Sequence, residues 1–192
     1  MRTIPLLLAV LLPAAMPATA AEVRYELDPA HTFPSFEADH LGGLSVWRGK
    51  FNRSRGLVTL DREAGDGRLE VVVETGSVDF GLDAMDEHAR GPDLLDVDRH
   101  PEARYTGRLA GFADGRPTRV EGELTLRGVT RPLALEILAF QCMPHPLHGR
   151  ELCGADALAR FQRDDFGIDA GKAYGFDMAV TLRIQVEAVA AE

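Results

Sequence analysis

The sequence has little of several features, and each shortage excludes a class of protein. After residue 20 it has no apolar run of the roughly 20 residues that a membrane-spanning helix requires, so an integral membrane protein is not expected. Basic residues are also scarce: 21 Lys and Arg stand against 30 Asp and Glu, for a net charge of −9. An acidic chain without a basic cluster repels phosphate backbones, so no nucleic-acid partner is expected.

Serine is too sparse for a serine hydrolase, and none lies in a Gly-x-Ser-x-Gly elbow. Paired carboxylates are frequent, but in so acidic a chain they are typical of solvated turns and helix caps. We therefore predict no catalytic residues and no cofactor, and we do not expect an enzyme. The serines after residue 20 are Ser35, Ser45, Ser54 and Ser77.

The N-terminal segment has the pattern of an export signal. Arg2 is its one charge, an apolar stretch follows over residues 4–12, and small residues close the segment. We expect residues 1–20 to be a cleaved signal peptide. Residues 21–192 would then form one exported domain, periplasmic or secreted.

Cysteine occurs only twice, at Cys142 and Cys153. An oxidising compartment favours their joining into a disulfide, which closes a loop of about 12 residues and stabilises the fold by roughly 3 kcal/mol. His145 and His148 lie between them, so a zinc site of these four residues, in a metal-binding enzyme or sensor, is the alternative. Two prolines stiffen this loop against wrapping around an ion, so we predict the disulfide and no metal.

Apolar and polar residues alternate along much of the chain, which is typical of strands with one buried face. The clearest example runs from Phe176 to Val186. Many short strands of this kind, separated by Gly, Pro and Asp turns, predict an all-β fold, either a closed antiparallel barrel or a sandwich. The other predicted strands are 23–27, 69–73, 120–126 and 133–137, and the predicted hairpin turns are 62–68 and 114–118.

The alternation stops between residues 81 and 101. Leu82, Met85 and Ala89 have the spacing of one helix face, and a Gly-Pro pair ends the pattern. We expect a short helical insertion near residues 81–98, lying over one opening of the barrel.

The apolar strand faces leave the nature of the interior open. A barrel of about eight strands can be filled by its own side chains, or it can enclose one ligand in a lipophilic cavity. The residue pattern favours neither possibility.

Five segments, in order along the chain, resemble the YceI-like polyisoprenoid-binding family from about Tyr25 to Glu187. Four residues depart from the family's usual pattern, and of these Ala89 and Gly91 replace the bulkier or hydroxyl residues of its helical insertion. Thr32 stands where serine is usual, and Pro34 interrupts an apolar strand, which predicts an edge position or a bulge. The segments are Tyr25, Asp28, His31 and Thr32 with Phe36, His40 and 48–51; 86–88; 92–96; 122–132; and 163–168.

The resemblance implies an exported, extended antiparallel lipocalin-like β-barrel that holds a polyisoprenoid or similar amphiphilic lipid in an apolar tunnel, without covalent chemistry. The lipid would be the ligand in place of a cofactor, and the oligomeric state, a homodimer included, stays open. Strand parity and the helical insertion together suggest which residues line the tunnel. These candidates are Phe36, Phe51, Phe80, Leu82, Met85, Leu94, Phe166, Phe176, Met178 and Val180.

Overall fold

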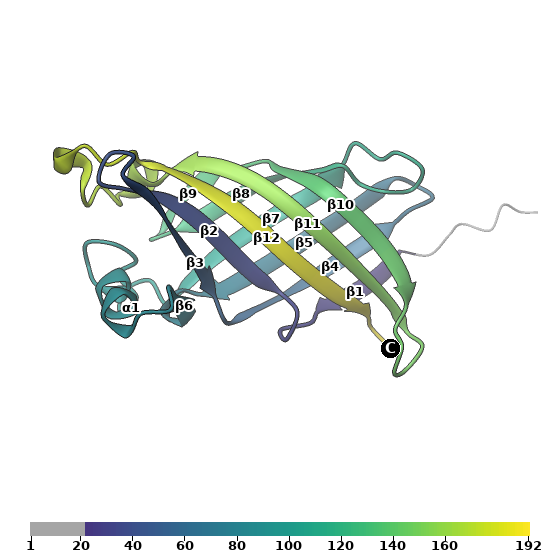
Figure 1. The fold of residues 1–192 in the computed structure, drawn as a ribbon. Coiled ribbons are helices and arrows are strands. Elements are labelled where there is room, and N and C mark those ends of the chain that lie inside the picture. The colour runs from purple at the N-terminus through teal and green to yellow at the C-terminus, as the bar shows by residue number, and fades with distance from the viewer. Residues whose placement is uncertain (1–21) are drawn as a thin grey trace, which may run out of the picture.

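Eight antiparallel strands close into a barrel (Figure 1). The structure is a computed structural model that describes residues 22–192, so the predicted signal peptide lies outside the described residues. The barrel closes because β12 pairs with β1, which confirms the predicted all-β fold. In order around the barrel, the strands are β1 (Val23–Leu27), β4 (Ser54–Asp61), β5 (Asp66–Glu74), β7 (Glu102–Ala110), β8 (Arg119–Leu126), β10 (Leu135–Pro144), β11 (Glu151–Gln162) and β12 (Ala179–Ala190).

Three further strands form a side sheet on β12, in the order β2, β3, β6. A fourth, β9, pairs with the end of β8. None of the helices within residues 22–192 is long and apolar enough to cross a membrane. These elements are β2 (Phe33–His40), β3 (Ser45–Phe51), β6 (Val78–Asp79), β9 (Val129–Pro132), α1 (Asp83–Arg90) and the 3₁₀ turns η1 (Thr75–Ser77), η2 (Arg163–Phe166) and η3 (Lys172–Tyr174).

The two ends of the barrel differ in what they carry (Figure 1). The terminal end holds the beginning of β1, the end of β12 and the β10–β11 turn. The loop end holds α1, the β2–β3 and β8–β9 turns, and the segment 163–178 between β11 and β12. The helical insertion therefore lies at one opening of the barrel, as predicted.

Alternation along β12 decides which side chains face the interior. Leu182, Ile184 and Val186 pack against the core, whereas Arg183 and Gln185 are exposed on the outer face. The strand begins at Ala179, three residues later than the start of the predicted alternation. The alternation of apolar and polar residues therefore predicted the inward face of β12 correctly. The predicted strand starts too early because residues 176–178 belong to the loop before β12.

Pro34 lies in β2 where that strand has a single partner. It pairs with Ile184 of β12, and pairing with β3 begins only at Ser35. A proline cannot donate a ladder hydrogen bond, so a position open on one side suits it. The predicted edge position is confirmed.

The barrel seam depends on Thr32, where β12 passes from β1 to β2. Thr32 is fully buried, with 0% exposure. Its Oγ1 donates to the Glu187 carbonyl oxygen at 3.1 Å and accepts from the Glu187 N–H at 3.2 Å. The hydroxyl therefore fills the gap between two ladders, because its single oxygen both donates and accepts.

Replacing Thr32 with valine tests this seam. Thr32→Val keeps the shape but leaves the buried Glu187 N–H unpaired, so we expect the free energy of unfolding to fall by about 2 kcal/mol in chemical denaturation. Thr32→Ser keeps the hydroxyl and is the matched control, with a smaller loss. Equal losses in the two variants would contradict a hydrogen-bonding role for Thr32.

Candidate functional site

The barrel interior is apolar along the inner faces of its strands. Tyr25 and Tyr105 bring the bulkiest inward rings of the main core, and Tyr105 Oη donates to the Leu133 carbonyl oxygen at 2.8 Å. Its ring takes up space that a side chain at Gly122 would need, since a Cβ there would lie 2.5 Å from Tyr105 Oη. The fully buried members of this core are Tyr25, Leu27, Leu60, Leu109, Val120, Leu133, Leu135, Cys153, Ala157, Ala159 and Ala188.

Many inward-facing side chains of this wall are only partly buried. In a barrel filled by its own side chains they would be close-packed and inaccessible. Solvent therefore reaches part of the inner wall. The partly buried members include Val58, Leu69, Val71, Leu124, Ile137, Phe140, Leu182, Ile184 and Val186.

An aromatic group covers the inner face of the side sheet near the loop end. The Phe36 ring lies 5.6 Å from that of Phe51 and 5.3 Å from that of Phe80, measured between centroids. Phe36 also lies over Gly49, where a Cβ would come within 2.7 Å of the ring, so glycine is required for this contact. Trp47, His40 and Phe176 extend the group, with Trp47 next to Phe80 and His40 between Trp47 and Phe176.

A second apolar cluster joins three loops at the loop end. Phe166 and Ile168, after β11, pack with Leu126 and with Leu94 from the helical insertion. Phe166 also meets the inward ring of Phe161 edge-on at 5.3 Å. Three of the segments that resemble the YceI-like family therefore meet at one place.

Two arginines hold these loops by donating to backbone carbonyls. Arg127 donates to the Leu94 oxygen at 2.8 Å and to the Gly167 oxygen at 3.1 Å. The guanidinium of Arg163, a buried residue, donates to the carbonyl oxygens of Ile168 and Ala170, and burial lowers its pKa. These carbonyl oxygens accept the hydrogen bonds of the buried guanidinium, so no buried carboxylate is needed beside it.

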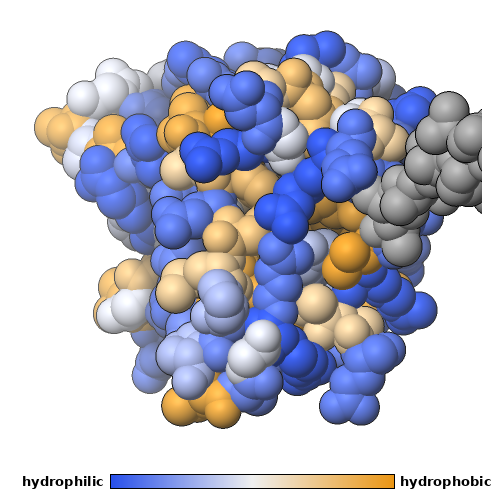
Figure 2. Space-filling model, turned by 90° about the vertical axis from the view of Figure 1, so that its right-hand side faces the viewer, coloured by the Kyte–Doolittle hydropathy of each residue, from blue (hydrophilic) through white to orange (hydrophobic). Residues whose placement is uncertain are grey.

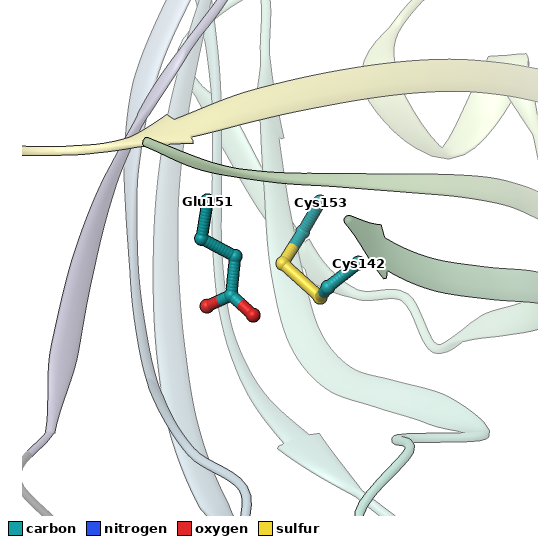
Figure 3. A group of neighbouring side chains, drawn as sticks. All are labelled: Cys142, Glu151 and Cys153. Carbon is teal, nitrogen blue, oxygen red and sulfur yellow. A yellow bond between two sulfur atoms is a disulfide. The ribbon is translucent and has the colours of Figure 1, made fainter. Parts of the chain in front are cut away.

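The terminal end carries a polar group and the disulfide (Figure 3). Tyr25, only 2% exposed, donates its hydroxyl to Glu151 at 2.5 Å, and Arg62 pairs with the other Glu151 oxygen at 2.7 Å. Burial raises the pKa of Tyr25, and the bond to Glu151 raises it further, so the phenol stays a neutral donor. Figure 2 shows this end of the molecule, where apolar side chains lie between hydrophilic ones.

Cys142 and Cys153 form the predicted disulfide. They lie directly opposite each other in the β10–β11 ladder, so the hairpin itself brings them together. Their sulfurs are consequently not thiolate ligands, and the four-residue zinc set loses half its donors. His145 and His148 instead stack on each other at the turn, with ring centroids 3.7 Å apart.

The ten predicted tunnel residues fall into several groups. Phe36, Phe51, Phe80 and Phe176 belong to the aromatic group. Leu94 and Phe166 belong to the second cluster, and Met178 and Val180 are buried at and just before the start of β12. Met85 is half-buried on α1, while Leu82 is 60% exposed at the start of that helix. No bound ligand tests their role, so it stays a prediction.

Sequence reasoning missed much of the inner wall. Trp47 and His40 lie inside the aromatic group, and the small residues Ala157 and Ala159 face the core from β11. Alternation over 155–161 was the available signal, but alanines give a weak apolar pattern.

Two hollows also lie on the surface of the described chain. One, of about 590 Å³, lies between the β2–β3 turn and the loop before β12 and includes Asp39, Arg160 and Phe176. The other, of about 800 Å³, lies beside β8, β10 and β11, and its lining includes Leu135, Ile137 and Ala159 of the inner wall as well as the charged Glu136 and Arg160. Both have charged side chains in their walls, unlike the apolar interior.

A closed antiparallel barrel with a partly open apolar inner wall defines a binding-type fold of the lipocalin-like kind. The chain matches the YceI-like domain over residues 25–188, and it belongs to that family. It is 33% identical to a UPF0312 protein of Pectobacterium carotovorum over 182 residues, which cover 93% of this chain and 92% of the relative. It is also 33% identical to protein YceI of Shigella flexneri, with 90% and 88% covered.

Solved structures show the same fold. BcnA of Burkholderia cenocepacia has a TM-score of 0.67 at 17% identity, with 84% of this chain and 98% of that chain covered. The YceI protein of Campylobacter jejuni has a TM-score of 0.66 at 22% identity, covering 80% and 90%. A polyisoprenoid-binding domain from Saccharophagus degradans has a TM-score of 0.62 at 19% identity, covering 88% and 99%.

Arg127 gives a test of how the loop end is held. Its φ of 49° lies in the left-handed region, which asparagine also tolerates. Arg127→Asn should keep the turn but lose both carbonyl bonds, lowering the free energy of unfolding by about 1–2 kcal/mol. Amide hydrogen exchange should accelerate in residues 92–96 and 165–168.

The matched control for this test is Arg131→Asn. Arg131 is an exposed arginine on β9, and within residues 22–192 its side chain donates to the Thr130 carbonyl oxygen alone. For Arg131→Asn we expect little change in the free energy of unfolding or in the rate of amide hydrogen exchange. The same acceleration of exchange in both variants would show that the carbonyl bonds of Arg127 do not hold the loops.

The disulfide gives a second test. Changing both Cys142 and Cys153 to alanine should lower the free energy of unfolding by roughly 3 kcal/mol, because the unfolded chain loses its cross-link. A thiol reductant should have the same effect on the unaltered protein and none on the double variant. Insensitivity of the unaltered protein to reduction, together with free thiols in it, would contradict the assignment.

Proposed function

We propose that this protein binds a polyisoprenoid or similar amphiphilic lipid in its barrel and sequesters or carries it without covalent chemistry. The observation that carries the proposal is the inner wall, whose apolar side chains line the barrel but remain partly accessible. The name of the Saccharophagus neighbour, a polyisoprenoid-binding domain, supports the same ligand class.

Burial supplies the driving force for such binding. A lipid chain in water exposes apolar surface at a free-energy cost of roughly 25 cal/mol per Å². Contact with an apolar wall removes that cost without requiring new hydrogen bonds. Every buried side-chain polar atom among residues 22–192 already has a hydrogen-bond partner. A ligand in the interior therefore needs to supply shape complementarity and apolar contact but few hydrogen bonds, which suits a long hydrocarbon chain.

The aromatic group is our candidate for the part of the tunnel near the loop end. Its rings come from β2, β3 and the loops beside them, and it continues the apolar face of β12. Rings in tilted and edge-on contact present flat apolar faces that suit the unsaturated units of an isoprenoid.

We also propose that the protein works outside the cytoplasm, in the periplasm or after secretion. The signal-like pattern of residues 1–20 and the disulfide support this location. A carrier in an aqueous space would shield a chain that water cannot dissolve.

The direct experiment is to purify the exported protein, extract it with organic solvent and identify bound lipid by mass spectrometry. Ala157→Trp, which points into the barrel from β11, should reduce the recovered lipid at least tenfold because the indole occupies the ligand space. Its matched control is Asp156→Trp, which adds the same ring on the exposed outer face of the same strand.

The stability of the same variants separates a cavity from a filled core. In a cavity the indole of Ala157→Trp is accommodated and unfolding stays cooperative, whereas in a filled core it overpacks and lowers the stability by about 1–3 kcal/mol or more. Ala157→Leu is the milder variant if the tryptophan prevents folding. If no lipid is recovered and an added polyprenyl chain does not bind, the proposal is wrong.

A further inference from the structure

Three side chains of metal-ligand type meet on the outside of the barrel, at the seam between β1, β2 and β12. Asp28 and His31 come from the turn between β1 and β2, and Glu187 comes from β12. Their ligand atoms all lie within 4.8 Å of one another. The closest pair is His31 Nδ1 and Asp28 Oδ2, at 2.7 Å.

The backbone fixes these three residues relative to one another. The Asp28 N–H donates to the Glu187 carbonyl oxygen at 2.9 Å, and the buried Thr32 hydroxyl bonds both backbone groups of Glu187. Asp28 Oδ1 accepts the Ala30 N–H at 2.9 Å, which leaves Oδ2 facing His31. Little conformational freedom would remain to be lost on binding an ion.

The charges of this cluster favour a cation. The Glu187 carboxylate has no hydrogen bond or ion pair within residues 22–192, so it remains available as a ligand beside the Asp28–His31 pair. The His31 side chain is 58% exposed, so an ion could reach it from solution.

We propose that Asp28, His31 and Glu187 bind one divalent transition-metal ion, with Zn²⁺ the natural probe. Zinc takes imidazole nitrogen and carboxylate oxygen at about 2.0–2.2 Å, which places neighbouring ligands of a tetrahedron about 3.4 Å apart. His31 Nδ1 and Asp28 Oδ2 lie 2.7 Å apart, and no two ligand atoms of the cluster are more than 4.8 Å apart, so side-chain rotations can bring them to that spacing. An imidazole ligand disfavours calcium and magnesium, which prefer oxygen.

The ion would connect the β1–β2 turn to β12 across the barrel seam. In the unfolded chain Asp28 and His31 lie far from Glu187 in sequence, so the complete site exists only in the folded protein. Metal binding should therefore stabilise the fold, and the effect should grow with metal concentration. This inference is independent of the lipid proposal, because the cluster lies on the outer face of the wall.

Calorimetric titration of the chelator-treated protein with Zn²⁺ tests the site. We expect one strong site per chain and a rise in melting temperature of several degrees at saturation. Glu187→Gln removes one ligand without breaking any hydrogen bond of the described chain, so it should leave the metal-free melting temperature unchanged and weaken Zn²⁺ binding at least tenfold. His31→Ala should weaken it similarly.

Two control variants carry the same chemical changes elsewhere. Glu136→Gln alters an exposed carboxylate of β10, and His88→Ala an exposed imidazole of α1; both should leave Zn²⁺ affinity unchanged. If no Zn²⁺ binds, or if Glu187→Gln and His31→Ala bind it as tightly as the unaltered protein, the metal site is refuted and the Asp28–His31 contact only closes the turn.

Discussion

The fold depends on the backbone pairing of β12 along its whole length. One of its edges pairs with β11, and the other is shared by β1 and β2. An unpaired stretch inside a barrel wall would leave buried N–H and C=O groups without partners, at a cost of about 1–3 kcal/mol each. Between the β1 and β2 ladders, the Thr32 hydroxyl accepts from the Glu187 N–H and adds a second donor, beside the Asp28 N–H, to the Glu187 carbonyl oxygen. Closure of the barrel, and with it the enclosure of an apolar interior, depends on β12 being paired with both β11 and β1.

Local pattern predicted those parts of the fold that local physics controls. Alternation identified the inward face of β12, the Asp-Gly turns marked the hairpins, and the spacing of Leu82, Met85 and Ala89 located α1. The side sheet could not be predicted in this way. Its position depends on β2 pairing with a strand about 150 residues further along the chain, and the period of two carries no information on partners.

The same distinction applies to the candidate sites. Four of the ten predicted tunnel residues meet in the aromatic group, because the β2–β3 pairing puts Phe36 and Phe51 on one face. Trp47 joins them through its register with Ala38, which only the β2–β3 pairing defines. The loop with two cysteines and two histidines looked like a zinc site because spacing measures proximity along the chain. The cluster of Asp28, His31 and Glu187 had no such signal, since the fold alone brings Glu187 to the turn.

The two ends of the barrel are held by interactions of different strength. At the terminal end a covalent bond joins β10 to β11, and Glu151 connects Tyr25 with Arg62 beside it. At the loop end, Arg127 and Arg163 hold the loops through hydrogen bonds to carbonyl oxygens, each contributing about 1 kcal/mol net. Water can replace such bonds one at a time, but it cannot replace a disulfide. The loops beside the aromatic group are therefore held by individually weaker interactions than the β10–β11 hairpin at the terminal end.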